Sequence, residues 1–214
     1  MIHNLSEKDS IVSEWLSEVR DTTSQKDRMR FRRNLERIGE ILGYEISKTL
    51  KYEAKTVYTP IADTECNVLH MQPVLATILR AGVPLYNGLL NVFDKADCAF
   101  IASYRQHTGD GILSINQQYV TQPSIEYRPL IIADTMLATG SSLLIAIKEL
   151  IKNETPSSIH IVCIIASPEG IKFLQEQLPN AHIWVACIDN GLNEIGYITP
   201  GLGDAGDLCY GKKL

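Results

Sequence analysis

Residues 130–152, LIIADTMLATGSSLLIAIKELIK, pass from four apolar residues through one carboxylate, Asp134, into Thr-Gly-Ser-Ser and then directly into a helical pattern. A continuous apolar run is typical of a strand that is covered on both faces of a parallel sheet. The carboxyl end of such a strand opens into a crevice, where the next helix presents unpaired N–H groups and the positive end of its dipole. The stretch therefore predicts a strand, an anion-binding turn and a helix.

The same alternation of apolar runs, turns and helical periods extends from residue 74 to residue 189. Pro168 and Glu169 support one helix start, because proline and an acidic side chain are favoured in the first turn. The pattern indicates an α/β fold with a doubly wound, mostly parallel sheet. It predicts strands at 74–79, 98–104, 129–133, 160–166 and 183–188, and helices at 84–93, 142–152 and 169–178.

Two segments lie outside this alternation. Residues 196–211 are too rich in glycine for an ordinary helix or a central strand, so we expect a shaped loop there. Residues 1–55 are predicted to form a helical N-terminal extension that docks on the sheet or on another subunit. Its apolar positions follow two helical stripes, Ile11, Trp15 and Val19, and then Leu35, Ile38, Leu42 and Ile46.

The composition suits a single domain over residues 1–214, because 45% of the residues are hydrophobic and 21% are charged. A net charge of −5 argues against broad binding of nucleic acid or anionic membranes and favours a small partner. The five cysteines are odd in number and lack CxxC spacing, so we expect them to be reduced. Together with the lack of an apolar targeting or bilayer-spanning stretch, this predicts a cytoplasmic protein.

The turn after residues 130–133 has the chemistry of a sugar-phosphate site. Thr139, Gly140, Ser141 and Ser142 can offer several amides and three hydroxyls to one phosphate, while Asp134 can hold ribose hydroxyls. The alternative is that these residues merely cap a helix, which Ser and Thr often do.

The whole nonapeptide DTMLATGSS, residues 134–142, resembles the phosphoribosyl pyrophosphate (PRPP) motif of the type I phosphoribosyltransferases, in the form close to DPMLATGGS that their uracil-specific branch carries. Thr135 replaces Pro, and Ser141 replaces a Gly. Purine-specific relatives carry an Asp where this chain has Ala138, which suits a pyrimidine that loses its proton with less help. The resemblance implies PRPP binding by Asp134, Thr135, Met136, Leu137, Ala138, Thr139, Gly140, Ser141 and Ser142.

Two arginines match the same family. Arg80, in TILRAG at residues 77–82, can clamp pyrophosphate with its planar guanidinium, although alone it would indicate only a surface arginine. The uracil enzymes carry the same ILRAG before the PRPP motif. Arg105 lies in residues 103–128, which resemble the family's flexible hood and can form a hairpin. His107, where the family carries acidic residues, is expected to be a solvated loop residue.

The segment GYITPGLGDAGD, residues 196–207, matches the uracil loop of this family almost residue for residue. A glycine-rich backbone can present its own C=O and N–H groups to the acceptor, donor, acceptor edge of uracil. The alternative is a surface Ω-loop whose glycines serve only to turn the chain. The resemblance implies that residues 189–211 form the base site, with Ile198, Gly203, Asp204 and Ala205 lining it.

The activity that the resemblance implies is that of a uracil phosphoribosyltransferase in pyrimidine salvage. Uracil N1 attacks the anomeric carbon of PRPP, which releases pyrophosphate and forms UMP. Arg80, Arg105 and Asp204 are the candidate catalytic residues. The implied cofactor is Mg²⁺, held mainly by pyrophosphate with Asp204 as the candidate protein ligand, and the implied assembly is a homodimer or homotetramer.

The alternative of a different class is an RNA-binding regulator on the same fold. Its support is the basic stretch KDRMRFRRNLER, residues 26–37, with six Lys or Arg residues. Alternation with Met29, Phe31 and Leu35 favours a solvated helix face or a subunit contact instead. In relatives a basic surface of this type also serves an allosteric nucleotide, so GTP is a candidate effector.

Overall fold

The computed structural model describes residues 1–107 and 113–213, and of residues 103–107 and 113–118 it describes the backbone alone. Its centre is an eight-stranded sheet in which the described neighbours pair in parallel, except for the antiparallel pair β5 and β6. The short β8 (Met136–Leu137) pairs with β9 beside the main path. Along that path the order is β1 (Ile2–Asn4), β10 (His182–Ile188), β9 (Ser158–Ala166), β7 (Pro129–Ala133), β4 (Val74–Leu79), β5 (Asp97–His107) and β6 (Leu113–Thr121).

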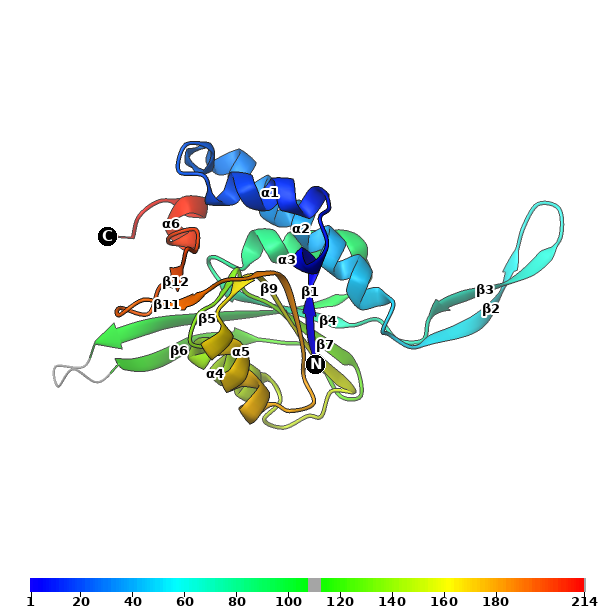
Figure 1. Ribbon diagram of the computed structural model, residues 1–214. Helices are drawn as coiled ribbons and strands as arrows, with labels where there is room; N and C mark the ends of the chain where they lie inside the picture. The colour runs from blue at the N-terminus through cyan, green and yellow to red at the C-terminus, as the bar shows by residue number, and fades with distance from the viewer. Residues whose placement is uncertain (108–112, 214) are drawn as a thin grey trace.

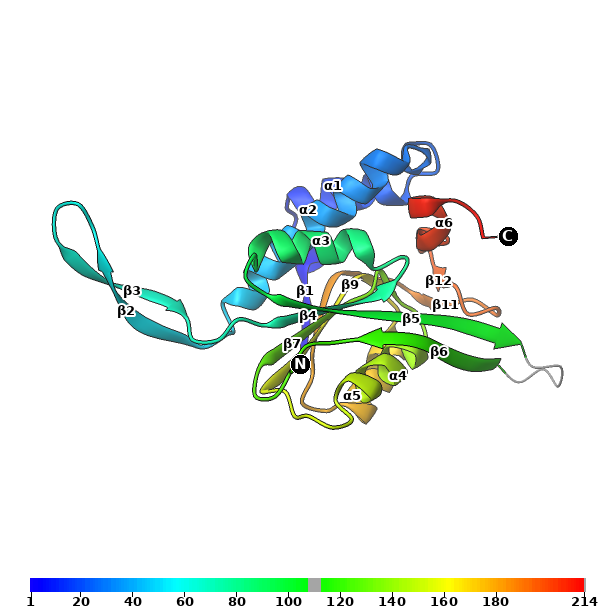
Figure 2. The same ribbon diagram turned by 180° about the vertical axis from the view of Figure 1, so that it is seen from behind.

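Helices cover both faces of this sheet, as Figures 1 and 2 show. The continuous apolar strands β4, β7 and β9 supply side chains to two hydrophobic cores, one under each layer. This arrangement is the predicted doubly wound α/β fold. One layer contains α1 (Ile11–Arg20), α2 (Arg28–Ser47) and α3 (Val83–Val92), and the other contains α4 (Ser141–Leu150) and α5 (Pro168–Gln177).

The predicted strands and helices are confirmed, with ends that move by at most three residues. In the N-terminal layer, the stripe from Leu35 to Ile46 is fully buried as expected. In the earlier stripe Val19 is buried as predicted, but Ile11 is 51% exposed, and the other buried positions are Val12 and Leu16, each one residue after the predicted one. Two short 3-10 helices, Leu5–Glu7 and Ser24–Lys26, flank α1.

Glycines bring α2 and α3 into close contact. A side chain at Gly39 would come within 2.5 Å of the carbonyl oxygen of Leu85, and one at Gly88 would collide with the backbone of Glu36. The backbones of the two helices can therefore approach more closely than larger residues at these positions would allow.

Several elements were not predicted. Strand β1 adds to the edge of the sheet beside β10, although residues 1–55 were expected to be helical. Strands β2 (Tyr52–Tyr58) and β3 (Asp63–Leu69) form a hairpin that projects from the body of the molecule (Figure 1). The pairing of β5 with β6 confirms the hairpin expected within residues 103–128, but it ends at Thr121. After it, Ile125 is fully buried in the core.

The glycine-rich C-terminus contains more regular structure than expected. β11 (Gly191–Leu192) pairs with β12 (Ile198–Thr199), and residues 205–210 form the helix α6 (Ala205–Tyr210) rather than a loop. Asp204 caps this helix by accepting a 2.9 Å hydrogen bond from the N–H of Asp207. An N-terminal cap of this kind offsets the low helix propensity of glycine.

All five cysteines are free, as expected. Among the described residues, no helix combines the length and the apolar character that crossing a bilayer requires.

Candidate active site

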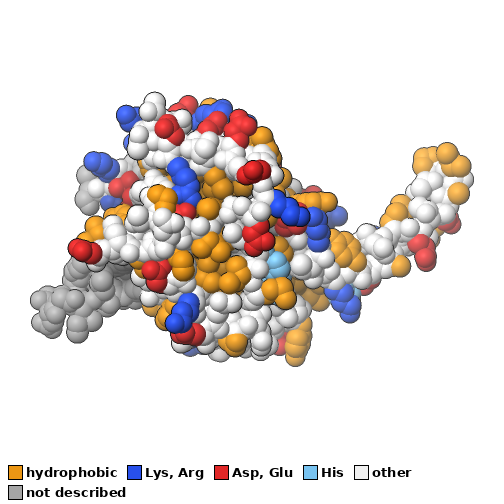
Figure 3. All heavy atoms as spheres, viewed as in Figure 1, with side chains coloured by type: hydrophobic (Ala, Val, Ile, Leu, Met, Phe, Trp, Pro, Cys, Tyr) orange, Lys and Arg blue, Asp and Glu red, His pale blue; other side chains and the backbone are white. Residues whose placement is uncertain are grey.

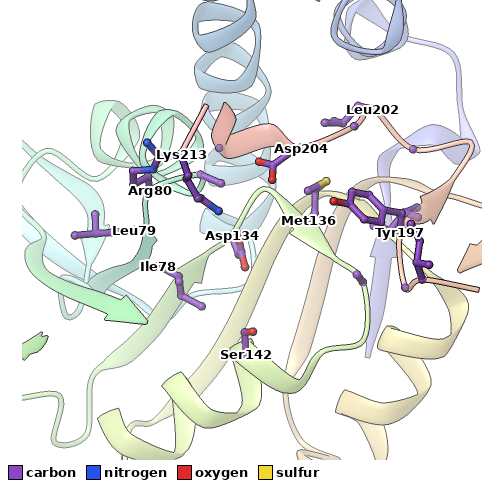
Figure 4. A pocket seen from close by; sticks show the side chains of 18 of the residues that line it. Ile78, Leu79, Arg80, Asp134, Met136, Ser142, Tyr197, Leu202, Asp204 and Lys213 are labelled. Atoms are coloured by element: carbon purple, nitrogen blue, oxygen red, sulfur yellow. The ribbon is translucent and has the colours of Figure 1, made fainter. Parts of the chain in front are cut away.

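The candidate site is a cavity of about 820 Å³ at the carboxyl ends of β4 and β7 (Figure 4). Ligands of doubly wound sheets bind at this edge. The lining comes from the turn after β4, from β5, from the residues between β7 and α4, and from the C-terminal segment. It consists of Ile78, Leu79, Arg80, Ala81, Ala102, Asp134, Met136, Ala138, Ser142, Ile195, Gly196, Tyr197, Ile198, Gly201, Leu202, Gly203, Asp204, Gly206 and Lys213.

A smaller hollow of about 60 Å³ adjoins this cavity and shares Asp134, Met136, Ala138 and Ser142 with it. Thr139 and Gly140 complete the turn that surrounds it. The hollow lies at the first turn of α4, where the amide groups lack intrahelical partners and the helix dipole is positive. Its position and its small residues suit the terminal phosphate of a larger ligand.

Gly140 is required at the start of α4 for two reasons. Its φ is +80°, a left-handed conformation that side chains disfavour. A side chain there would also lie 3.0 Å from Phe173 and 3.1 Å from Leu174 of α5. The hydroxyls of Thr139 and Ser141 lie 3.3 Å apart at the same turn. The backbone of this turn therefore has a fixed shape.

Not every residue of the nonapeptide, residues 134–142, lines the cavity or the smaller hollow. Thr135 is fully buried and lines neither hollow, because its hydroxyl donates a 2.6 Å hydrogen bond to the carbonyl of Ala81. Ser141 is also absent from both linings. The remaining seven residues line one hollow or both, and they are Asp134, Met136, Leu137, Ala138, Thr139, Gly140 and Ser142.

Arg80 and Asp204 lie on the same side of the cavity. The Arg80 guanidinium is 3.4 Å from a carboxylate oxygen of Asp207 and 3.5 Å from the carbonyl of Gly211, and 41% of its side chain is exposed. Its weak, long contacts leave it available to a ligand. Arg105 lies in the backbone pairing of β5 with β6, but its side chain and that of His107 fall outside the described part of the chain.

The C-terminal segment lines the cavity with Ile198, Gly203 and Asp204, as predicted. Ala205 is fully buried and does not contribute to the lining. Gly201 and Gly203 have φ values of +66° and +95°, and a side chain at Gly201 would collide with the carbonyl of Ile198. These positions therefore need glycine.

Tyr197, Leu202 and Lys213 line the cavity although the sequence analysis did not single them out. Tyr197 and Leu202 lie within the segment GYITPGLGDAGD, residues 196–207, so their place in this motif was the signal that could have identified them. Lys213 gives no such signal, because it lies in the C-terminal tail. Figure 4 shows its side chain between Arg80 and Asp134.

The charged groups of the cavity suit an anionic ligand with a divalent cation. Arg80 and Lys213 are positive, while Asp134 and Asp204 are negative. The described residues contain no group of three His, Cys, Asp or Glu side chains that could hold a metal by themselves. Mg²⁺ fits such a site when it takes one or two carboxylates and completes its coordination with phosphate oxygens and water.

The neighbouring cysteines are poor nucleophiles. Burial raises the pKa of the Cys209 thiol to about 12, and burial together with the charge of Asp134 raises the pKa of Cys163 well above its ordinary value. Both thiols therefore stay protonated at neutral pH, and covalent catalysis by cysteine is excluded for these two residues.

The comparison with known families decides the identity of the chain. The profile of the family described as uracil phosphoribosyltransferase matches residues 6–212. The chain belongs to the uracil phosphoribosyltransferase family. Apart from Lys213, the residues that line the cavity all fall within the matched range, and so does the turn before α4.

Two curated relatives carry the name uracil phosphoribosyltransferase. The protein from Porphyromonas gingivalis is 46% identical over 100% of this chain and 99% of its own length. The protein from Pyrococcus furiosus is 38% identical over 95% of this chain and 87% of its own length. A solved structure from Aquifex aeolicus, 32% identical, superimposes with a TM-score of 0.88 and covers 99% of this chain and 98% of that one. The fold is thus shared with that structure over nearly the whole of both chains.

Proposed function

We propose that the protein catalyses the transfer of a phosphoribosyl group from PRPP to uracil, which forms UMP and pyrophosphate in pyrimidine salvage. The observation that carries the proposal is the meeting of two motifs in one cavity. The phosphate-type turn at the start of α4 supplies Ser142 on one side, and the glycine-rich segment supplies Leu202 and Asp204 on the other (Figure 4).

PRPP lies along the strand ends in this proposal. Its 5′-phosphate occupies the hollow of about 60 Å³ at the first turn of α4, where backbone amides and the hydroxyls of Thr139 and Ser142 bind it. Asp134 holds the ribose hydroxyls. Arg80 and Arg105 neutralise the pyrophosphate. Its bond to the anomeric carbon breaks early as uracil N1 attacks, which gives the transition state oxocarbenium-like character, as in other glycosyl transfers. The protein contributes mainly by positioning and by charge.

Uracil lies against the C-terminal segment. Backbone groups near Gly201 and Gly203 can approach the base closely because no side chain intervenes. Cytosine would present an amine where uracil presents a carbonyl, and a fixed set of buried hydrogen-bonding groups rejects such a mismatch strongly. Ile198 packs against the base, and Ala205 supports this segment from the buried side of α6.

Mg²⁺ is the cofactor in this proposal, with Asp204 as its protein ligand, and when bound it neutralises the charge of the pyrophosphate. Asp204 also caps α6, so its substitution has two effects that must be separated. Asp204→Asn keeps the cap, because asparagine is an equally good N-cap, but removes the negative charge. Asp204→Ala removes both.

The test is UMP formation from uracil, PRPP and Mg²⁺ by the purified protein, with cytosine, orotate and hypoxanthine in parallel. We expect turnover with uracil only and a large loss of activity in both Asp204 variants. Asp204→Asn should keep wild-type thermal stability. Binding of PRPP without turnover of any base would contradict the proposal and favour a regulator on the same fold.

The basic stretch at residues 26–37 gives little support to the regulator. Arg30 pairs with Glu18, Arg33 pairs with Glu36, and Arg32 donates to the carbonyl of Cys209. Arginines engaged in this way are less available to an RNA backbone. The basic stretch at residues 26–37 is also the candidate binding surface for a GTP effector.

A homo-oligomer is the proposed assembly, and the β2–β3 hairpin supports it. The hairpin projects into solvent and carries exposed apolar side chains near its tip, with Tyr58 79% and Ile61 96% exposed (Figure 3). Apolar residues on a projecting arm suit packing against another subunit.

A further inference from the structure

Arg20 is the last residue of α1 in the N-terminal layer. Its side chain contacts the C-terminal segment that lines the cavity. Its guanidinium contacts both carboxylate oxygens of Asp189, at 2.9 Å and 2.5 Å, and donates another 2.9 Å hydrogen bond to the carbonyl of Gly201. The Asp189 side chain is 3% exposed and that of Arg20 is 23% exposed. The pair is therefore a bidentate ion pair largely removed from water.

Asp189 completes the arrangement by accepting a 2.9 Å hydrogen bond from the N–H of Gly201. Both backbone polar groups of Gly201 are thus held by one ion pair. The chain turns sharply there, with a φ of +66°, and packs so closely on the carbonyl of Ile198 that no side chain fits. The ion pair consequently fixes the conformation of the turn between β12 and α6.

This turn is part of the cavity wall, since Ile198, Gly201, Leu202 and Gly203 all line it. A buried ion pair adds little net stability, because desolvation of the two charges offsets much of their attraction. Removing one partner, however, leaves the other charge unpaired and frees the groups that it held. The expected contribution of the pair is therefore to hold one conformation rather than to stabilise the whole fold.

We propose that Arg20 is a positioning residue for the base, which acts through Asp189 and Gly201 on the backbone that receives uracil. The inference rests on the proposed function of the C-terminal segment. It assigns a role in base recognition to the N-terminal helix layer, which does not itself touch the cavity. The 5′-phosphate of PRPP binds at the turn before α4, on the opposite side of the cavity, so we expect the binding of PRPP to depend much less on Arg20 than the binding of uracil does.

The test compares steady-state constants for uracil and for PRPP in Arg20→Met, Arg20→Lys and Asp189→Asn. Lysine keeps the charge but cannot form the bidentate contact and donate to Gly201 in the same geometry. The matched control is Arg30→Met, because Arg30 makes a similar two-nitrogen contact with Glu18 in solvent, at 2.8 Å and 2.6 Å. Thermal unfolding of each variant shows whether it is folded.

We expect the KM for uracil to rise on the order of tenfold or more in Arg20→Met, since small displacements of a binding group can cost as much as a hundredfold. The KM for PRPP should stay within about twofold, and Arg20→Lys and Asp189→Asn should lie between wild type and Arg20→Met. The double variant Arg20→Met with Asp189→Asn should be no worse than Arg20→Met, because both changes act on one unit.

Equal rises in both KM values, or no rise for uracil in any variant that folds, would overturn the proposal. If Arg20→Met does not fold, Arg20→Lys and Asp189→Asn decide the question alone. The wild-type assay separates this failure from failure of the proposed function, because an active wild type with an unchanged Arg20 variant rejects the positioning role only.

Discussion

The hydroxyl of Thr135 donates a 2.6 Å hydrogen bond to the carbonyl oxygen of Ala81 and so ties together the turns that follow β7 and β4. Both turns line the cavity, one through Asp134 and the other through Arg80. Thr135 is fully buried, so water cannot replace this bond. A proline, which stands at this position in the family motif that the nonapeptide resembles, has no hydroxyl and could not donate this bond.

Thr135→Val should weaken both the fold and the binding of PRPP. Valine has nearly the same shape as threonine but leaves the carbonyl of Ala81 without its donor, which costs about 1–3 kcal/mol when the group is buried. We expect that loss in the free energy of unfolding by urea, and a raised KM for PRPP with little change for uracil. Thr135→Ser should restore both values, and a Thr135→Val variant with wild-type kinetics would disprove the link between the two turns.

Gly140→Ala should be more destabilising than Gly196→Ala. Both glycines have a φ near +80°, so alanine is strained at either position. A Cβ at Gly140 would also press on Phe173 and Leu174, whereas nothing lies within 4 Å of one at Gly196. We expect Gly140→Ala to lose about 1–3 kcal/mol more than Gly196→Ala in urea unfolding, as overpacking usually does. Equal losses would show that backbone strain alone governs both sites.

The sequence predicted the central sheet well because its strands are buried on both faces. Strands β4 and β7 were predicted to the residue, since a continuous apolar run has clear ends. Strand β1 was missed because three residues show no periodicity, and its partner β10 lies at the other end of the chain. The β2–β3 hairpin was missed because most of its side chains are exposed and follow no burial pattern.

The residues that line the cavity could be named from the sequence where they are continuous in it, but not where they come together through tertiary contacts. The turn before α4 and the segment with Gly203 and Asp204 are short motifs, so their residues could be named in advance. Lys213 and Arg20 reach the site region only through the folding of the two chain ends. Contacts between residues far apart in the sequence cannot be predicted from the short pattern of apolar and polar residues around either of them.

Acid should destabilise the protein through a stacked cluster at the sheet edge, formed by His3, His160, His182 and Trp184. Burial lowers the pKa of His160 to about 3, and burial also lowers the pKa of His3 and His182. The indole N–H of Trp184 donates to Nδ1 of His160, so this nitrogen must stay unprotonated.

A histidine whose pKa is lowered by folding binds its proton more readily in the unfolded chain. Its contribution to stability is complete above about pH 6.5 and is lost as the pH falls below that value towards 3. The slope for His160 alone is at most about 1.4 kcal/mol per pH unit. We therefore expect the free energy of unfolding by urea to fall between pH 7.5 and pH 5.

The matched variants are His160→Asn and His70→Gln. Asparagine can still accept from Trp184 but does not titrate, so His160→Asn should show a shallower pH dependence than wild type. His70 is exposed, contacts Glu53 and lies outside the cluster, so His70→Gln is the control for replacing a histidine elsewhere in the chain. A slope in His160→Asn equal to that of wild type would locate the acid sensitivity elsewhere.

Removing the apolar tip of the β2–β3 hairpin should weaken self-association. Tyr58→Ser with Ile61→Ser replaces two side chains that are 79% and 96% exposed in the single chain, so the fold should lose little stability. Analytical ultracentrifugation at matched concentrations should show a shift towards the single-chain mass of 23.9 kDa. Tyr127→Ser, at a tyrosine that is 71% exposed on the body of the molecule, is the control and should sediment as wild type. A wild-type protein that already sediments as a single chain, or a tip variant with unchanged mass, would rule out the arm as a subunit contact.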